Sequence, residues 1–129
     1  MTDKRRTINV NVPRECHLWT KPGLTAGDIQ TALVQVRLYE DDSHLIRTLL
    51  KCRLCGQLYF HEFYEIVDWE QGNDAQYSSW IPIDDAQSAD DLNMLAPLEL
   101  LRFGGLRIDF PTTADQPTPP YWRTSQPKD

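Results

Sequence analysis

The sequence predicts a small α+β protein: an antiparallel sheet, a hairpin around a Cys-x-x-Cys turn, and two or three short helices. Three observations support this class. The chain has 129 residues, the size of one domain, and its 40% of hydrophobic residues suffice for one core. Its longest regular stretches are rich in aromatic and β-branched residues, which favour strands. Helical spacing is confined to short stretches between glycines and prolines.

In the first half of the chain we expect strands and one helix. Pro13 ends the first strand, and Thr25 or Asp28 begins the helix, whose apolar residues recur at helical spacing up to Val36. A polar break at 40–43 separates this helix from the next strand. The expected elements are strands at 6–12, 16–19 and 44–52 and a helix from 25 or 28 to 36.

The second half predicts a hairpin, two short helices and a last strand. Gly72 and Asn73 form the hairpin turn, and Ser88 is the expected cap of the first helix. The expected elements are strands at 58–69, 76–83 and 106–110 and helices at 89–95 and 97–103. Residues 1–110 then form one domain. Residues 111–129 contain five prolines and are expected to be an extended tail, held by Tyr121 and Trp122.

Composition bears on compartment and partners. No apolar run approaches the ~18 residues of a membrane span, and the first residues lack the apolar stretch of a signal peptide. The three cysteines are an odd number and cannot form a complete set of disulfides. We therefore expect a cytoplasmic protein with reduced thiols and no membrane partner.

The net charge of −6 conceals a strong asymmetry. Residues 54–101 contain ten acidic residues and no Lys or Arg, whereas nine of the basic residues lie before position 54. Such a polarised chain favours a positively charged partner over nucleic acid, since phosphate contacts dominate binding to nucleic acid.

The clearest chemical signal is Cys52-x-x-Cys55, followed directly by Gly56. Two thiolates at this spacing can hold one metal ion from a tight turn, and the glycine permits the left-handed backbone that points amides toward sulfur. Residues 51–60 resemble the knuckles of zinc-ribbon and rubredoxin-like proteins, which implies a structural zinc ion. A redox pair is disfavoured because a strand, not a helix, follows the second cysteine.

A closed tetrahedral site needs two further ligands, and the sequence has no second Cys-x-x-Cys pair. The remaining thiol is Cys16, so one histidine must complete the site. His61 and His44 lie on the strands that leave and enter the turn, and we rank them equally. His17 ranks third because adjacent ligands at 16 and 17 would strain one another. The alternative is three free cysteines and no metal.

The catalytic motifs that we considered are incomplete in this sequence. The run His61-Glu62-Phe63-Tyr64-Glu65 lacks the second histidine of a metalloprotease motif and lies in a strand. The scattered glycines form no phosphate loop. We therefore expect no enzyme activity.

The function expected from the sequence is that of a zinc-stabilised protein-interaction module. Acidic and aromatic residues of the hairpin and the following loop would bind a basic partner, such as a nuclease or toxin, in the manner of an immunity protein. The alternatives are a nucleic-acid-binding adaptor and a structural subunit of a larger complex. The expected contact residues are Asp68, Trp69, Glu70, Asp74, Trp80, Asp84 and Asp85.

Overall fold

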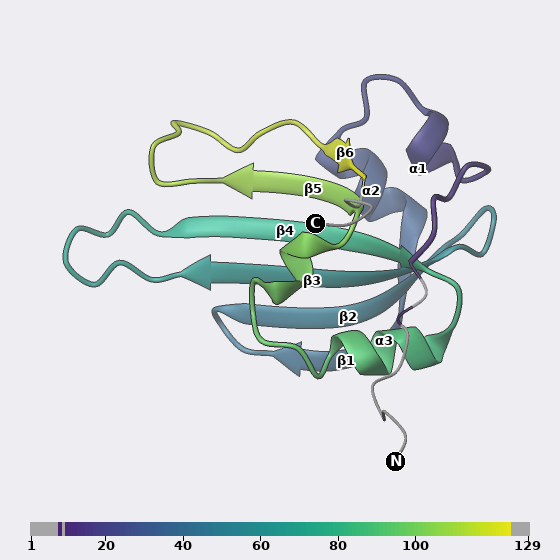
Figure 1. The fold of residues 1–129 in the computed structure, drawn as a ribbon. Helices are drawn as coiled ribbons and strands as arrows, with labels where there is room; N and C mark the ends of the chain where they lie inside the picture. The colour runs from purple at the N-terminus through teal and green to yellow at the C-terminus, as the bar shows by residue number, and fades with distance from the viewer. Residues whose placement is uncertain (1–7, 9, 125–129) are drawn as a thin grey trace, which may run out of the picture.

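The computed structural model describes residue 8 and residues 10–124, and it confirms the α+β class. Six antiparallel strands form one sheet, and their order in the sheet is their order along the chain (Figure 1). The strands are β1 (Leu33–Asp41), β2 (Leu45–Cys52), β3 (Leu58–Ile66), β4 (Ala75–Ile83), β5 (Gly105–Phe110) and β6 (Tyr121–Arg123). The helices are α1 (His17–Thr20), α2 (Ala26–Ala32), α3 (Ala86–Leu92) and the 3-10 helix η1 (Glu99–Arg102). No helix among the described residues is both long and apolar enough to cross a membrane.

The predicted hairpin is present as β3 and β4, in the middle of the sheet. Leu58 lies opposite Ile83 at one end of the pair, and Ile66 lies opposite Ala75 at the other. β3 stops at Ile66 and does not reach residue 69. The Asp68 carboxylate accepts the backbone N–H groups of residues 70 and 71, each at 3.1 Å, which turns the chain.

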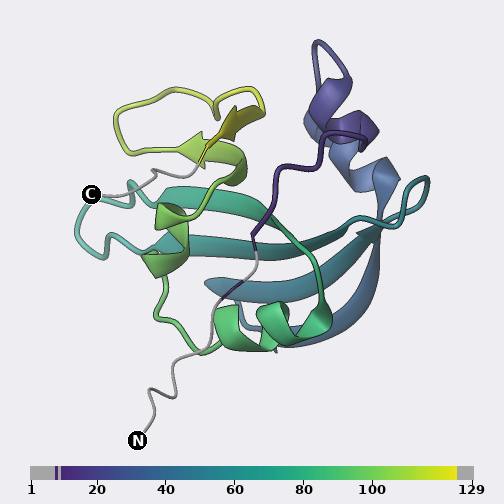
Figure 2. The ribbon, with the colours of Figure 1, turned by 45° about the vertical axis from the view of Figure 1, so that its right-hand side comes forward.

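The two faces of the sheet are covered by different elements (Figure 2). On the first, which we call the α3 face, α3 and η1 pack on a core built around Phe60. On the second, the α1–α2 face, the N-terminal helices cover one end of the sheet around Tyr59. Tyr59 and Phe60 are neighbours on β3, and both are 0% exposed. The prediction that this strand is covered on both sides is therefore confirmed.

The N-terminal elements differ from the prediction. Residues 16–19 do not form a strand, since α1 begins at His17, and α2 ends at Ala32. Leu33 instead begins β1, because β1 pairs with β2 from Leu33, opposite Cys52, to Asp41, opposite Ile46, with two irregularities in between. Tertiary pairing thus overrides the helical spacing of the apolar residues. Residues 6, 7 and 9 of the strand expected at 6–12 lie outside the described residues; among the described ones, Val10 forms an isolated bridge to Ile83.

The C-terminal elements are also shifted. Asp85, not Ser88, caps α3: its carboxylate accepts the Ser88 N–H at 2.9 Å, so the helix begins earlier than expected. The helix expected at 97–103 is the shorter η1. Part of the expected tail belongs to the sheet, because β6 pairs with β5. The Trp122 indole N–H donates to the carbonyl of Leu18 at 3.0 Å, which fixes this segment to α1.

Candidate metal centre

The turn between β2 and β3 has the geometry expected of a metal-binding knuckle. Cys52 is the last residue of β2, and the Gly56 N–H donates to its carbonyl at 3.0 Å. Gly56 has φ of +81°, the left-handed conformation inferred from the sequence. The backbone amides of Leu54 and Cys55 lower the pKa of the Cys52 thiol. The knuckle is therefore formed by the backbone of the turn.

The second part of the centre comes from the start of α1. Cys16 precedes the helix with an extended backbone, φ −80° and ψ 134°, and His17 is the first helical residue. Cys16 is 2% exposed and Cys52 is 1% exposed. The knuckle is also tied to α2, because the Arg53 N–H donates to the Ala32 carbonyl at 2.8 Å. This backbone hydrogen bond fixes the knuckle relative to α2.

The structure brings together Cys16, His17 and Cys52. Their ligand atoms all lie within 4.8 Å of one another, and the Cys52 Sγ is 3.8 Å from the His17 Nδ1. In a tetrahedral zinc site with Zn–S of about 2.3 Å and Zn–N of about 2.0–2.1 Å, ligand atoms are about 3.5–3.8 Å apart. These three side chains could hold a metal ion.

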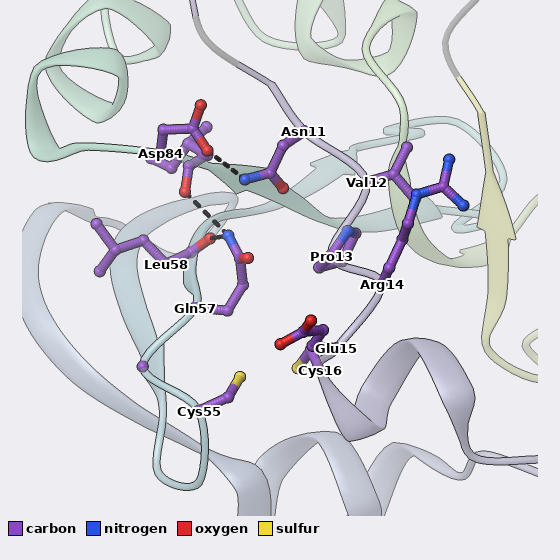
Figure 3. Close-up of a pocket in the computed structure, with 12 residues that line it drawn as sticks. Asn11, Val12, Pro13, Arg14, Glu15, Cys16, Cys55, Gln57, Leu58 and Asp84 are labelled. Atoms are coloured by element: carbon purple, nitrogen blue, oxygen red, sulfur yellow. Dashed lines mark hydrogen bonds between the residues drawn. The ribbon is translucent and has the colours of Figure 1, made fainter.

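Cys55 is the fourth candidate. Its thiol interacts with the thiols of Cys16 and Cys52, although the residue itself is exposed. Cys55 and Cys16 lie at the edge of a cavity of about 470 Å³, and Figure 3 shows their sulfur atoms at the same end of it. Cys55 therefore lies beside the cluster, but it is not part of the group whose ligand atoms lie within 4.8 Å of one another.

The thiols of Cys16 and Cys52 need a nearby positive charge if both are to be ionised. Burial raises the pKa of the Cys16 thiol to about 12, and the Tyr59 hydroxyl beside it offsets only part of this effect. Burial also disfavours ionisation of Cys52, but the amides of Cys55 and Leu54 outweigh it and lower the pKa of the Cys52 thiol. A bound cation would stabilise both thiolates.

Tyr59 provides an independent sign that the donor set fits a metal. Its side chain is 0% exposed, and its hydroxyl has no hydrogen-bond partner among the described residues. Burial, and then the neighbouring Cys16, raise the pKa of Tyr59 above its usual range, so the hydroxyl keeps its proton. It could donate that proton to a metal-bound Cys16 thiolate, as partners outside the ligand shell commonly do.

The two histidines preferred from the sequence are not at the centre. His61 is stacked on Trp80, with ring centroids 4.6 Å apart, and lies opposite Thr48. Thr48 is about 13 Å along β2 from Cys52. His44 pairs with Glu65, with Nδ1 3.1 Å from Oε1.

The sequence argument ranked His17 third because it treated adjacent ligands at 16 and 17 as strained. The change from extended to helical backbone between Cys16 and His17 lets their side chains converge. The sequence feature that could have identified His17 is its position directly after Cys16, the one cysteine outside the knuckle.

The residues expected to contact a partner do not form one surface. Asp68, Trp69, Glu70 and Asp74 lie at the turn between β3 and β4, whereas Asp84 and Asp85 follow the opposite end of β4. The two groups are about 27 Å apart along the strand. Trp80 is only 9% exposed and belongs to the core, so the expectation that it contacts a partner is wrong. Trp69, in contrast, is 87% exposed.

The fold and the Cys/His cluster define a six-stranded antiparallel meander with a candidate metal centre at one end. Comparisons of the chain with models of known protein families, with curated protein sequences and with solved structures find no match.

Proposed function

We propose that this chain is a small zinc-stabilised module of the cytoplasm that binds a basic protein, with Trp69 as the anchor of its contact surface. The observation that carries this proposal is the turn between β3 and β4. It presents an indole that is 87% exposed, next to acidic residues, in a stretch of the chain without Lys or Arg. Exposed aromatic anchors supply most of the binding energy at many interfaces.

The zinc part of the proposal rests on the donor set. Cys16, His17 and Cys52 lie together, and Cys55 would be the fourth ligand. Three thiols and one imidazole favour zinc over the cations that prefer oxygen ligands. Four protein ligands leave no open position, so the ion would be structural. Reduced thiols are needed for such a site, which is consistent with a cytoplasmic location.

The acidic side chains divide into those that build the fold and those available to a partner. Glu62 is buried and paired with Arg47, with N–O distances of 2.7 and 2.9 Å. The Asp74 carboxylate accepts the Asp68 N–H at 2.7 Å, so Asp68 and Asp74 hold the turn that presents Trp69. Glu70 is exposed and contributes only its backbone N–H to this turn. Glu70 is therefore the acid whose charge can be reversed without loss of the turn.

The zinc part is tested by metal analysis of protein purified without chelator. We expect about one equivalent of zinc and a loss of stability when a chelator is added. Less than about a tenth of an equivalent, with unchanged stability in chelator, would reject the metal centre.

The binding part is tested by quantitative affinity capture from the source cells with three baits. Trp69→Ala removes the proposed anchor, Glu70→Lys reverses a neighbouring charge, and Met94→Ala is the matched control, since Met94 is 82% exposed but follows α3. We expect one basic protein to be retained by the wild type and the control and reduced at least about tenfold by Trp69→Ala. For that protein, Glu70→Lys should slow association and leave dissociation nearly unchanged. Equal capture by the wild type and Trp69→Ala would refute the proposed surface.

A further inference from the structure

Cys55 differs from the other two cysteines in its access to solvent. Cys55 is exposed, whereas Cys16 is 2% exposed and Cys52 is 1% exposed. The cavity of about 470 Å³ beside the metal centre is bounded by Cys55 and Cys16, and Cys52 is not among the described residues that line it. A small solute that enters this cavity therefore meets Cys55 before it meets either of the other thiols.

The thiols of Cys16 and Cys55 lie beside each other. All three cysteines are free, the Cys55 thiol interacts with the Cys16 thiol, and Figure 3 shows both sulfur atoms at the same end of the cavity. Cys16 directly precedes α1, and Cys55 belongs to the turn between β2 and β3. An accessible thiol with a second thiol close to it is the arrangement of cysteines that respond reversibly to oxidants.

The wall of the cavity suits a small polar solute. The polar side chains of this wall are Asn11, Arg14, Glu15, Gln57 and Asp84. The Gln57 amide donates to the carbonyls of Leu58 and Ile83, each at 2.9 Å, which fixes the wall near Cys55. Hydrogen peroxide is small and uncharged, and it both donates and accepts hydrogen bonds. Such a wall therefore admits hydrogen peroxide to the sulfur atoms at its end.

We propose that hydrogen peroxide oxidises Cys55 through this cavity and that Cys16 then closes a Cys16–Cys55 disulfide. Loss of two of the four ligands would release the zinc ion, so the pair is a redox switch of the metal centre. The release of zinc rests on the proposed function, whereas the formation of the disulfide does not. Cytoplasmic disulfides are rare, and those that form are mostly catalytic or redox-sensing.

The reaction balances in two steps. In the first, the Cys55 sulfur attacks one oxygen of the peroxide: an S–O bond forms, the O–O bond breaks, and the leaving hydroxide takes the thiol proton and departs as water. In the second, the Cys16 sulfur attacks the sulfur of the Cys55 sulfenic acid: the S–S bond forms, the S–O bond breaks, and hydroxide leaves with the Cys16 proton as a second water. The thiols lose two electrons, and the peroxide gains them. Where the thiols begin as zinc-bound thiolates, solvent supplies the two protons.

The test treats the full chain with hydrogen peroxide, both loaded with zinc and after removal of metal by a chelator. Free thiols are then alkylated, and the protein is digested with trypsin for mass spectrometry. Trypsin places the three cysteines on separate peptides, 15–37, 52–53 and 54–102, because Lys21 precedes a proline and Arg53 separates Cys52 from Cys55. We expect peptides 15–37 and 54–102 to be joined by a disulfide that a reducing agent breaks. In the zinc-loaded protein, a chromogenic chelator should detect about one zinc ion released per disulfide.

Variants assign the roles of the two thiols. In the chelator-treated protein, Cys16→Ser should leave a sulfenic acid on Cys55 that dimedone traps. Cys52→Ser is the matched control, since Cys52 is buried and does not line the cavity, and it should still form the Cys16–Cys55 disulfide. The peptide map of the wild type decides the question even if a variant fails to fold.

The outcomes separate this inference from the metal centre. A disulfide between peptides 52–53 and 54–102, a disulfide between Cys55 residues of two copies, or a sulfinic acid on Cys55 without any disulfide would overturn the proposed pair. Retention of zinc in protein that has formed the Cys16–Cys55 disulfide would overturn the switch. Formation of the disulfide in protein that never binds zinc would support the pair and reject the zinc part of the proposed function.

Discussion

Replacement of His17 by glutamine tests the metal centre most directly, because His17 is the histidine that the structure places beside Cys16 and Cys52, whereas His61 and His44 lie elsewhere. The Cys52 Sγ lies 3.8 Å from the His17 Nδ1, and the ligand atom of Cys16 is within 4.8 Å of both. His17→Gln leaves the three thiols in place and removes the imidazole. The expected result is a folded protein with a much weaker affinity for zinc.

The size of this effect follows from the coordination. Partners outside the ligand shell are worth about 10–100-fold in metal affinity, so loss of a ligand should cost at least about 100-fold. When zinc is in excess over the wild-type dissociation constant, a 100-fold change corresponds to about 2.7 kcal/mol of stability. For a domain of this length, that lowers the melting temperature by roughly 10 °C.

The assay combines competition with a chromogenic chelator, which gives the zinc affinity, and thermal unfolding with and without added zinc. His44→Gln is the matched control, because His44 lies in the turn between β1 and β2 and pairs with Glu65, away from the centre. Wild-type zinc affinity in His17→Gln would refute His17 as a ligand. Loss of zinc affinity in His61→Gln would support His61 as the ligand, as expected from the sequence. Cobalt substitution provides a second readout, since the intensity of the thiolate charge-transfer band should be preserved in His17→Gln.

Three further predictions concern the fold. Gly56→Ala should lower the free energy of unfolding, measured in urea, by about 1–2 kcal/mol. The cause is the φ of +81° alone, because an added Cβ meets no atom within 4 Å. An unchanged free energy of unfolding would show that the turn relaxes. Arg47→Met should cost about 3–5 kcal/mol because it leaves the buried Glu62 carboxylate unpaired, and the further change Glu62→Leu should restore much of this stability if the pair is the cause. His61 has an ordinary pKa of 6.5 and a folded-state pKa of about 4, so the unfolded chain binds more protons between these values and stability is lost as pH falls from 6.5 to 4. This loss of stability is at most about 3 kcal/mol. His61→Gln lacks the titrating ring, so its stability should fall by up to about 3 kcal/mol less than that of the wild type over the same pH range. Parallel pH profiles of the two proteins would show that His61 is not the group responsible.

Local patterns predicted the central sheet well. β2, β3, β4 and β5 were recoverable from aromatic and β-branched runs between turn residues, because each strand pairs with a neighbour in sequence. The knuckle followed from the spacing of Cys52 and Cys55 and from Gly56. These features depend on residues close together in the chain, and a single sequence shows such features directly.

The errors arose where long-range contacts decide the structure. Leu33 and Val36 fit a helical spacing, but the residues of β1 gain backbone hydrogen bonds and packing by pairing with β2. Trp80 was treated as a surface anchor although it closes the core beneath the N-terminal helices. The position of His17 beside Cys52 depends on α1 docking against the far end of β2, which no local pattern reveals.

The metal centre and the core of the α1–α2 face share one structural element, which leads to a last prediction. α2 has 7 residues, too few for a stable isolated helix, so its position depends on its contacts. Ile29 of α2 packs in the core around Tyr59, and the carbonyl of Ala32, at the end of α2, accepts the N–H of Arg53 in the knuckle. An ion bound by Cys52 and His17 would also close a loop of 35 residues, and a cross-link of this length is worth about 3–4 kcal/mol in the chain-entropy model. Removal of the ion should therefore loosen α2, with faster amide exchange in α2 and unchanged exchange in α3. Equal exchange of the α2 amides with and without zinc, in protein that is folded in both states, would show that the core contacts of Ile29 hold α2 in place by themselves.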